Sequence, residues 1–534
     1  MNSSLKQERR AESASIMKAT AIMMFTIVLS RLTGQLRDIL AVNRFGYGRL
    51  ADSYFQGFLI PDFLYEILIG GSIQAAVVPT LSAAIGKKEE KETWRSVSVF
   101  ISLATVFMLL AVLLGELFSP QIMGLFTRPD THALAVGVSR RLFPQTFFMM
   151  MAALTIGILN SYRKFTASSF GPVIYNLMVV ISLAVFGAAN DAAVLRVAIG
   201  IAISALIFFM FEAYMAKSEL QNFRFSLDTR DAGTRKIIRL AIPTLISASI
   251  PQINNMILNV FMKELPAGTP ASLKNATSLW MLPWGVFAVA VGNVMLPTLS
   301  RHIADHNTRE AGELIGSSLK RALYLTVPCA LSFYFLRYDL VRGVFQWSSA
   351  YTEQAVRITG DILAFFCLTI VTHTIVFIMN QSFYATKKTF MPLLNSILSL
   401  MMTVLFGYFL SNPNVLGHRG LSLGYALGSL IGACFLLISF RKMFRSMAPR
   451  GLGSFIWKEI ICCVGMAVVL AVFQIFMGGW NPAGKLARLG WLGGRFLLAF
   501  AMYATLSYLL NMPEIHSVLG SISKRFKSRN GKYV

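Results

Sequence analysis

The sequence predicts an all-α polytopic membrane protein, and three observations lead to this prediction. Of the 534 residues, 55% are hydrophobic and only 14% are charged, with a mean hydropathy of +0.60. This composition is too apolar for an ordinary soluble protein. Apolar runs of about 20 residues, long enough to cross a hydrocarbon core, recur along the chain. Basic residues gather in the short connections between these runs, as they do in membrane proteins.

The apolar runs predict about fourteen membrane helices. In order, they cover residues 16–42, 51–84, 94–119, 141–161, 166–189, 193–215, 238–262, 271–300, 318–337, 355–383, 389–410, 421–440, 456–478 and 490–511. With an even number of helices, both termini lie on one side. Basic residues are about twice as frequent in the connections on that side, which predicts that both termini are cytoplasmic. The 49 Lys and Arg therefore indicate membrane orientation, and nucleic acid is not an expected partner.

Nothing in the sequence points to an enzyme, a metal or a cofactor. No nucleophile triad, phosphate-binding glycine loop or zinc spacing is present. The five cysteines lie in apolar segments without a CxxC pair, so neither disulfides nor a thiolate metal site is expected. His373 has no neighbouring carboxylate or histidine, and an interhelical hydrogen bond is expected of it.

An internal repeat predicts two lobes. The Pro-Thr-Leu-Ser of residues 79–82 recurs at residues 297–300, and Asn160, Phe170 and Pro172 recur at an offset of 220 as Asn380, Phe390 and Pro392. Six helices per repeat imply two lobes related by a pseudo-twofold axis along the membrane normal. The expected parts are an N-terminal lobe (1–215), a cytoplasmic linker with a short interfacial helix (216–237), a C-terminal lobe (238–445), and two further helices with a basic tail (446–534).

Charged residues in the first helix are the strongest pointers to function, because an ionisable group at membrane depth costs about 2.5–3.5 kcal/mol. Asp38 follows Arg31 by seven positions and returns to nearly the same helix face, with Arg37 beside it. This spacing predicts that all three line a polar, substrate-binding cavity. Alternatively, Arg37 and Asp38 end the helix and reach the outer interface.

The second helix carries Asp62 and Glu66, which are four residues apart and share a face. The nearest candidate partners in sequence are Arg31 and Arg37. Such pairs act either as structural ion pairs or as a switch, since a released carboxylate can bind a proton or Na⁺.

Prolines and glycines interrupt two of the expected helices at corresponding places in the repeat. The predicted hinge positions are Pro61, Gly70, Gly71 and Pro79 in the second helix and Pro283 in the eighth. Broken helices in corresponding positions of two repeats point to a transport site. Lys274, at the start of the eighth helix, is a further candidate for substrate binding, or else lies in an outer loop.

The segment Ser-Arg-Leu-Thr-Gly-Gln-Leu-Arg-Asp at 30–38 is followed by Phe-Gly at 45–46, Ala-Asp at 51–52, Pro-Asp at 61–62 and Val-Pro at 78–79. These residues resemble the MurJ (MviN) family of bacterial flippases for the lipid-linked peptidoglycan precursor. This family is part of the multidrug/oligosaccharidyl-lipid/polysaccharide exporter superfamily, and the likeness extends over essentially the whole chain.

The resemblance implies alternating access in the bacterial cytoplasmic membrane, in the service of cell wall biosynthesis. Cavity arginines would bind the diphosphate of an undecaprenyl-linked disaccharide-pentapeptide, and the last two helices would form a groove for its lipid tail. Arg31 and Arg37 match the family's first-helix arginines, Asp38 its adjacent acid and Asp52 the acid that opens the second helix. We expect a monomer among membrane lipids, without a cofactor, driven by Na⁺, protons or the membrane potential.

Two positions depart from the family pattern. Tyr65 and Glu66 replace the arginines of the family's Pro-Asn-x-x-Arg-Arg motif, and Thr277-Ser278 replaces an Asp-Arg pair. Lys274, one turn earlier, is a possible substitute for the second arginine. A cavity with fewer arginines binds a diphosphate less well. Three alternatives therefore stay open: a flippase for another lipid-linked oligosaccharide, a multidrug or cation exporter, and a non-transporting membrane scaffold.

Overall fold

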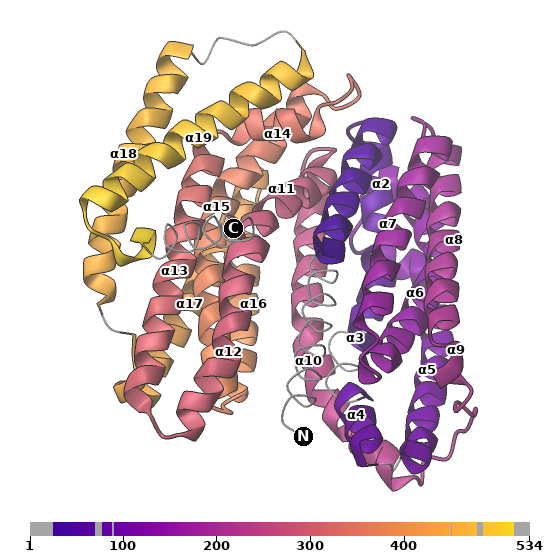
Figure 1. Ribbon diagram of the computed structural model, residues 1–534. Helices are drawn as coiled ribbons and strands as arrows, with labels where there is room; N and C mark the ends of the chain where they lie inside the picture. The colour runs from indigo at the N-terminus through magenta and orange to yellow at the C-terminus, as the bar shows by residue number, and fades with distance from the viewer. Residues whose placement is uncertain (1–24, 70–76, 88–89, 450, 478–483, 517–534) are drawn as a thin grey trace, which may run out of the picture. The chain divides into compact units, whose positions relative to one another are not determined.

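The computed structural model describes residues 25–69, 77–87, 90–449, 451–477 and 484–516. Within these ranges every regular element is a helix, which confirms the predicted all-α class. By their contacts the helices form two compact units, the first ending at Ala271 and the second beginning at Ser272 (Figure 1). The two units are described separately below.

Ten helices in the described ranges are long and apolar enough to cross a membrane, so the chain is a multi-pass membrane protein. The predicted number of fourteen is not confirmed. Two further helices, α10 and α13, have the length but fall short in apolarity. The first predicted span begins at residues outside the described ranges, and the second is broken into shorter helices.

The first unit begins with a helix over residues 25–45 and continues with nine labelled helices. They are α2 (Arg49–Gly57), α3 (Leu59–Ile69), α4 (Val78–Lys87), α5 (Glu90–Met123), α6 (Pro129–Ser161), α7 (Phe165–Phe186), α8 (Asp191–Met215), α9 (Lys217–Leu220) and α10 (Ala232–Phe261). The central helix is α6, which packs against α2, α3, α5 and α8. Its fully buried Val138 and Leu142 lie in one apolar core with Val194 and Ala198 of α8. This core fixes the helices that carry the charged residues.

The predicted interruption at Pro61 is confirmed. A break at Phe58 separates α2 from α3, three residues before the proline. Proline has no N–H to donate to the carbonyl of Gly57, and its ring disfavours a continuous helix there. Gly57 also packs closely on α6, because a Cβ at this position would lie 2.4 Å from Cγ1 of Val138.

The predicted linker contains the short helix α9 and then an extended segment that lies along α5. The backbone N–H groups of Arg224 and Ser226 donate to the hydroxyls of Ser98 and Ser102, at 3.2 and 3.1 Å. The two serines are four residues apart, so they form one polar strip on α5. This strip satisfies backbone donors that an extended segment would otherwise leave unpaired.

The second unit comprises most of α11 (Thr269–Pro283), the π-helical turn η3 (Trp284–Ala288), α12 (Val289–Ala304), α13 (Thr308–Phe335), α14 (Arg337–Phe345), α15 (Glu353–Ala385), α16 (Phe390–Leu410), α17 (His418–Met443), η4 (Arg445–Met447), α18 (Leu452–Met477) and α19 (Lys485–Leu509). In this unit α15 packs against α12, α13 and α17, and α18 packs against α13 and α19. The two expected additional helices are thus α18 and α19.

Corresponding helices of the two units have matching lengths. Both α6 and α15 have 33 residues, and each is followed by a tight turn in which one basic residue, Arg163 or Lys387, has a φ of 59°. Lys387 follows Arg163 by 224 residues, whereas Asn380 follows Asn160 by 220 residues. The two offsets differ by four residues, about one helical turn. The additional residues belong to the connection that contains α14 in the second unit. The lobe boundaries that the repeat predicts stay a prediction. When the chain is divided by the contacts between its helices, α10 belongs to the first unit, where it packs on α3 and α5.

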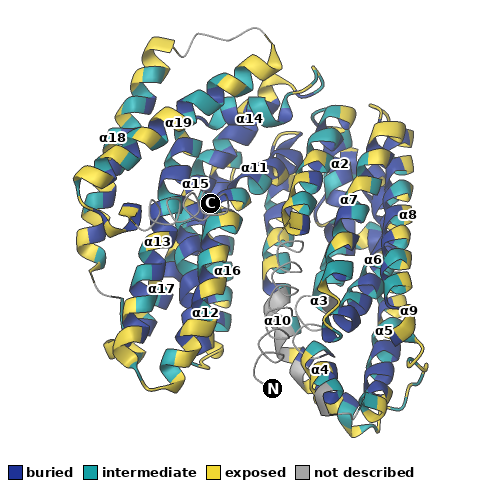
Figure 2. Ribbon diagram, in the orientation of Figure 1, coloured by how far each residue is buried: buried dark blue, intermediate teal, exposed yellow. Residues whose placement is uncertain are grey.

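Apolar side chains are exposed over long stretches of the outer helices, as expected of a surface that faces lipid. Exposed residues follow α18 along its length (Figure 2). They include Trp457, Val464 and Phe476. The residues of α18 that pack inward, such as Phe455 and Met466, are buried.

Candidate functional site

A polar cluster ties the first helix to α7 inside the first unit. Nε of Arg37 donates to Oδ1 of Asp38 at 3.0 Å, and Nη1 of Arg37 donates to Oδ1 of Asn176 at 3.3 Å. The Asn176 amide in turn donates to the carbonyl oxygen of Ser30 at 3.1 Å. Asp38 is buried and Arg37 is about one-quarter exposed. The guanidinium is therefore held in one orientation by two acceptors on different helices.

Two tyrosines and the carboxylates of α3 surround this cluster. Tyr175, next to Asn176 on α7, is buried and lies within electrostatic reach of Arg37, Asp38 and Asp62. Tyr54 of α2 is within reach of the same three charges. Glu66 follows Asp62 by one turn, and the two carboxylates repel each other. Three predicted site residues, Arg37, Asp38 and Asp62, are thus brought together around phenol groups, with Glu66 beside them.

The ion pairs of this region differ from those expected. The sequence suggests Arg31 and Arg37 as partners for Asp62 and Glu66, whereas in the described part of the unit Arg37 pairs with the adjacent Asp38. Arg31 lies two turns before Asp38 and is exposed. Its neighbours on the exposed side of the helix are Val28 and Leu32. The predicted position of Arg31 in a cavity, and the roles of the cluster in substrate binding, stay predictions.

Asp52 takes part in a different set of contacts. Its buried carboxylate accepts hydrogen bonds from the backbone N–H groups of Gly268, at 2.6 Å, and Ala271, at 3.2 Å. Arg128 lies 3.9 Å away. Gly268 has a φ of +88°, and a Cβ here would overlap the ring of Tyr47. Asp52 therefore fastens the start of α11 to α2, and its predicted role in substrate binding stays a prediction.

Lys274 belongs to the second unit, on α11, where it is exposed. The adjacent Asn275 is buried and donates to the hydroxyl of Tyr351 at 3.3 Å. That hydroxyl lies 2.8 Å from Oγ1 of Thr359. The polar residues that open α11 thus hold this helix to α15, and the predicted role of the exposed Lys274 in substrate binding stays a prediction.

The structure describes three of the predicted hinge positions. The helix is broken at Phe58, before Pro61, whereas at Pro283 the helix continues without a break from Thr269 to Ala304. After Pro283 the α-helix changes to the π-helical turn η3. Pro79 is the second residue of α4, and residues 70–76 before it lie outside the described ranges. Gly70 and Gly71 lie outside the described residues. π-helical turns are frequent at functional sites, but hinge motion at these positions stays a prediction.

The expectation for His373 is wrong in the described part of the second unit, where it makes ring contacts and no hydrogen bond. Its ring stacks on Tyr425 at 5.6 Å and meets the edge of Trp280 at 5.1 Å. The buried indole N–H groups of Trp280 and Trp284 have no acceptor among the described residues. An aromatic cluster therefore surrounds this histidine. No group of three or more His, Cys, Asp or Glu in the described ranges could hold a metal ion.

Two polar residues, one at the site and one in the second unit, are not apparent from sequence reasoning. Asn176 orients Arg37, and its only signal is that it is a lone amide within the apolar run 166–189. Arg495 lies inside the last predicted helix and binds Asp339 of α14 through two nitrogens, at 2.8 and 2.9 Å. An arginine within an apolar run is the signal that could have found it.

Comparison with known proteins gives one consistent result. The family model described as "Lipid II flippase MurJ" matches residues 41–489. The chain is 25% identical over 458 residues to the lipid II flippase MurJ of Burkholderia cenocepacia, covering 84% of this chain and 87% of that one. A solved structure of a lipid II flippase MurJ in an inward closed conformation has a TM-score of 0.75, 21% identity and coverage of 92% of this chain and 98% of the other. An inward-facing MATE family multidrug transporter has a TM-score of 0.66 and 16% identity, with coverage of 80% and 99%. The two structural likenesses concern the fold.

Proposed function

The chain belongs to the lipid II flippase MurJ family, and from this premise we propose that it moves lipid II from the inner to the outer leaflet of the bacterial cytoplasmic membrane. Lipid II is the undecaprenyl diphosphate-linked precursor of peptidoglycan. The family match over residues 41–489 is the observation that carries the proposal. The transport step is alternating access by a monomer, with both termini in the cytoplasm.

Arg37 is the residue best placed to bind the diphosphate. Asp38 accepts from its Nε and Asn176 from its Nη1, which leaves Nη2 without a hydrogen bond in the described part of the unit. A guanidinium that is already oriented loses less entropy when it binds a phosphate oxygen. Arg31, two turns away and exposed, supplies a second cation to the same headgroup.

Asp62 and Glu66 supply the coupling in this proposal. They lie on one face of α3 and repel each other, so uptake of a proton or Na⁺ lowers the unfavourable charge beside the substrate site. The membrane potential contributes about 2.3 kcal/mol per charge per 100 mV. No organic cofactor takes part.

The test is complementation of a bacterium depleted of its own flippase. The natural chain should restore growth and cell shape, and Arg37→Ala should not, at equal amounts of membrane-inserted protein. Arg196→Ala is the matched control, because Arg196 is an exposed arginine of α8 outside the cluster. Rescue by Arg37→Ala as full as by the natural chain contradicts the role of this guanidinium. A natural chain that inserts but fails to rescue contradicts lipid II as the cargo.

A cation or drug exporter is the second candidate, favoured by the two neighbouring carboxylates of α3. It predicts that expression raises resistance to cationic drugs and that Glu66→Gln abolishes this resistance while Arg37→Ala does not. Vesicle assays separate the two functions: lipid II flipping without cation-driven drug uptake supports the flippase, and the reverse supports the exporter.

A further inference from the structure

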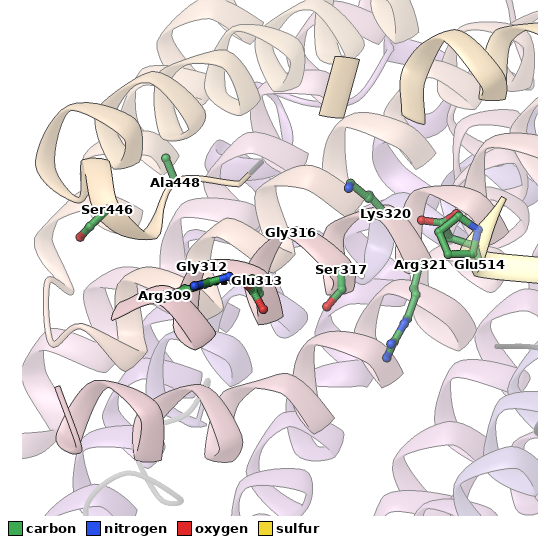
Figure 3. Close-up of a pocket in the computed structure, with 11 residues that line it drawn as sticks. Arg309, Gly312, Glu313, Gly316, Ser317, Lys320, Arg321, Ser446, Ala448 and Glu514 are labelled. Carbon is green, nitrogen blue, oxygen red and sulfur yellow. Dashed lines mark hydrogen bonds and ion pairs between the residues drawn. The ribbon is translucent and has the colours of Figure 1, made fainter. Parts of the chain in front are cut away.

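We propose that the second unit holds the phosphate of an anionic phospholipid in a cleft at the N-terminal half of α13. The cleft has a volume of about 240 Å³ and lies between α13, the connection from η4 to α18, and the residues after α19 (Figure 3). This inference depends on insertion into a membrane and not on the proposed transport function.

Glycines of α13 open the cleft. Gly312, Gly316 and Lys320 follow one another at intervals of four, so they form one row along the helix. A Cβ at Gly312 would lie 3.0 Å from Cα of Met447, which shows that the backbones of α13 and η4 are in contact here. Gly316 and Lys320, at the next two turns of α13, also line the cleft.

The cleft carries more positive than negative charge. Arg309 and Glu313 pair with each other at 3.1 Å, and both are exposed. Lys320 and Arg321 form no ion pair in the described part of the chain. Glu514 is the other acidic residue of the lining. A bound anion would therefore meet a net positive surface.

Lys320 also lies beside the first turn of α18. Its Nζ would be only 3.1 Å from a Cβ built at Gly451, the residue before this helix, and in Figure 3 its side chain extends toward the connection that contains Ala448. The first turn of α18 contains no acidic residue. An ammonium group and the positive end of a helix dipole repel each other, and an anion between them interacts favourably with both.

The surroundings favour a phospholipid over a free anion. Within two turns of Gly451, α18 exposes Ile456 and Trp457, and Trp457 is 66% exposed. Tryptophan is enriched where acyl chains meet head groups. Three more basic residues, Arg441, Lys442 and Arg445, lie at the end of α17 and in η4. Basic pockets between membrane helices recognise anionic head groups in this way.

The test measures lipid binding to the purified full-length chain. Thermal unfolding in detergent is followed with added phosphatidylglycerol, phosphatidylcholine or inorganic phosphate, and retained lipid is counted by native mass spectrometry. Phosphatidylglycerol should raise the unfolding temperature and remain bound, and the other two should not. Lys320→Gln should weaken retention about fivefold, the factor expected for one basic residue at an anionic surface.

Two variants control for folding and for general charge. Arg321→Gln alters an exposed side chain of the same cleft, so it should fold normally and weaken retention as well. Lys388→Gln removes an exposed charge from another turn of the same unit and should have no effect. Equal retention by Lys320→Gln and the natural chain overturns the proposal, as does equal stabilisation by phosphatidylcholine. Full stabilisation by inorganic phosphate alone overturns the lipid as the source of the anion.

Discussion

Arg495 of α19 donates two hydrogen bonds to a single carboxylate oxygen of Asp339 on α14, at 2.8 and 2.9 Å. Its Nη2 also lies 3.2 Å from Oε1 of Gln474 on α18, and the Arg495 side chain is only 5% exposed. One arginine therefore joins both C-terminal helices to the helix bundle of the second unit.

Removal of this arginine should destabilise the second unit. We expect Arg495→Ala to lower the free energy of unfolding by about 1–3 kcal/mol, because Asp339 loses a charged donor and a buried space opens. Arg495→Lys should restore part of the loss. Thermal unfolding in detergent measures the effect, and exposed Arg357→Ala is the control. An unchanged midpoint for Arg495→Ala would show that the helices are held by apolar packing alone.

Asp52 should be replaceable by asparagine only with a loss of stability. Both carboxylate oxygens accept backbone N–H groups, so the amide of Asp52→Asn must place its own N–H against one of these donors. The expected cost is about 1–3 kcal/mol. Hydrogen exchange at the amides of Gly268 and Ala271 should accelerate as well. Asp305→Asn, at an exposed acid of the second unit, is the control; equal protection in both variants argues against the clamp.

The two serines of α5 should determine how well the linker is protected from protease. Ser98→Ala and Ser102→Ala each remove an acceptor from a linker N–H, at an expected cost of about 1 kcal/mol each. We expect faster trypsin cleavage at Arg224 in the double variant. Ser204→Ala is the control, because its hydroxyl bonds only within its own helix. Identical cleavage rates would contradict a docked linker.

The ion pair between Lys164 and Glu219 should make stability depend on acid pH. Burial alone would raise the pKa of Glu219, but hydrogen bonds from Lys164 and Ser218 outweigh it and hold this pKa below the ordinary value of 4.5. A lowered pKa in the folded state stabilises the protein above pH 4.5, and this contribution is lost as the pH falls through the folded value. The midpoint difference between the natural chain and Glu219→Gln should therefore be constant near neutrality and shrink below pH 4.5. A difference that stays constant down to acid pH would contradict this pair.

Hydropathy correctly predicts the helices that face lipid, because it indicates whether a segment is surrounded by lipid or by water. The last two helices, predicted at 456–478 and 490–511, are Leu452–Met477 and Lys485–Leu509. Hydropathy says nothing about which helices pack together. The internal repeat places residues 238–262 in the C-terminal lobe, which stays a prediction, and the helix Ala232–Phe261 packs on α3 and α5.

The candidate site was only partly predictable for a similar reason. Charges inside apolar runs identify Arg37, Asp38 and Asp62, because their burial requires a polar environment. The partner of Arg37 is Asn176, which is 139 residues away in sequence. The donors that engage Asp52 are backbone amides, and these leave no trace in a pattern of side chains.

The turns at Arg163 and Lys387 place a long side chain in the left-handed region, at φ 59° in both units. Each such residue costs about 1 kcal/mol relative to glycine, and the fold accepts this cost twice at corresponding places. Glycine at both positions should give a more thermostable protein with two fewer positive charges. Arginine and lysine at these turns place positive charges in two connections between apolar helices, where basic residues orient membrane proteins in the bilayer.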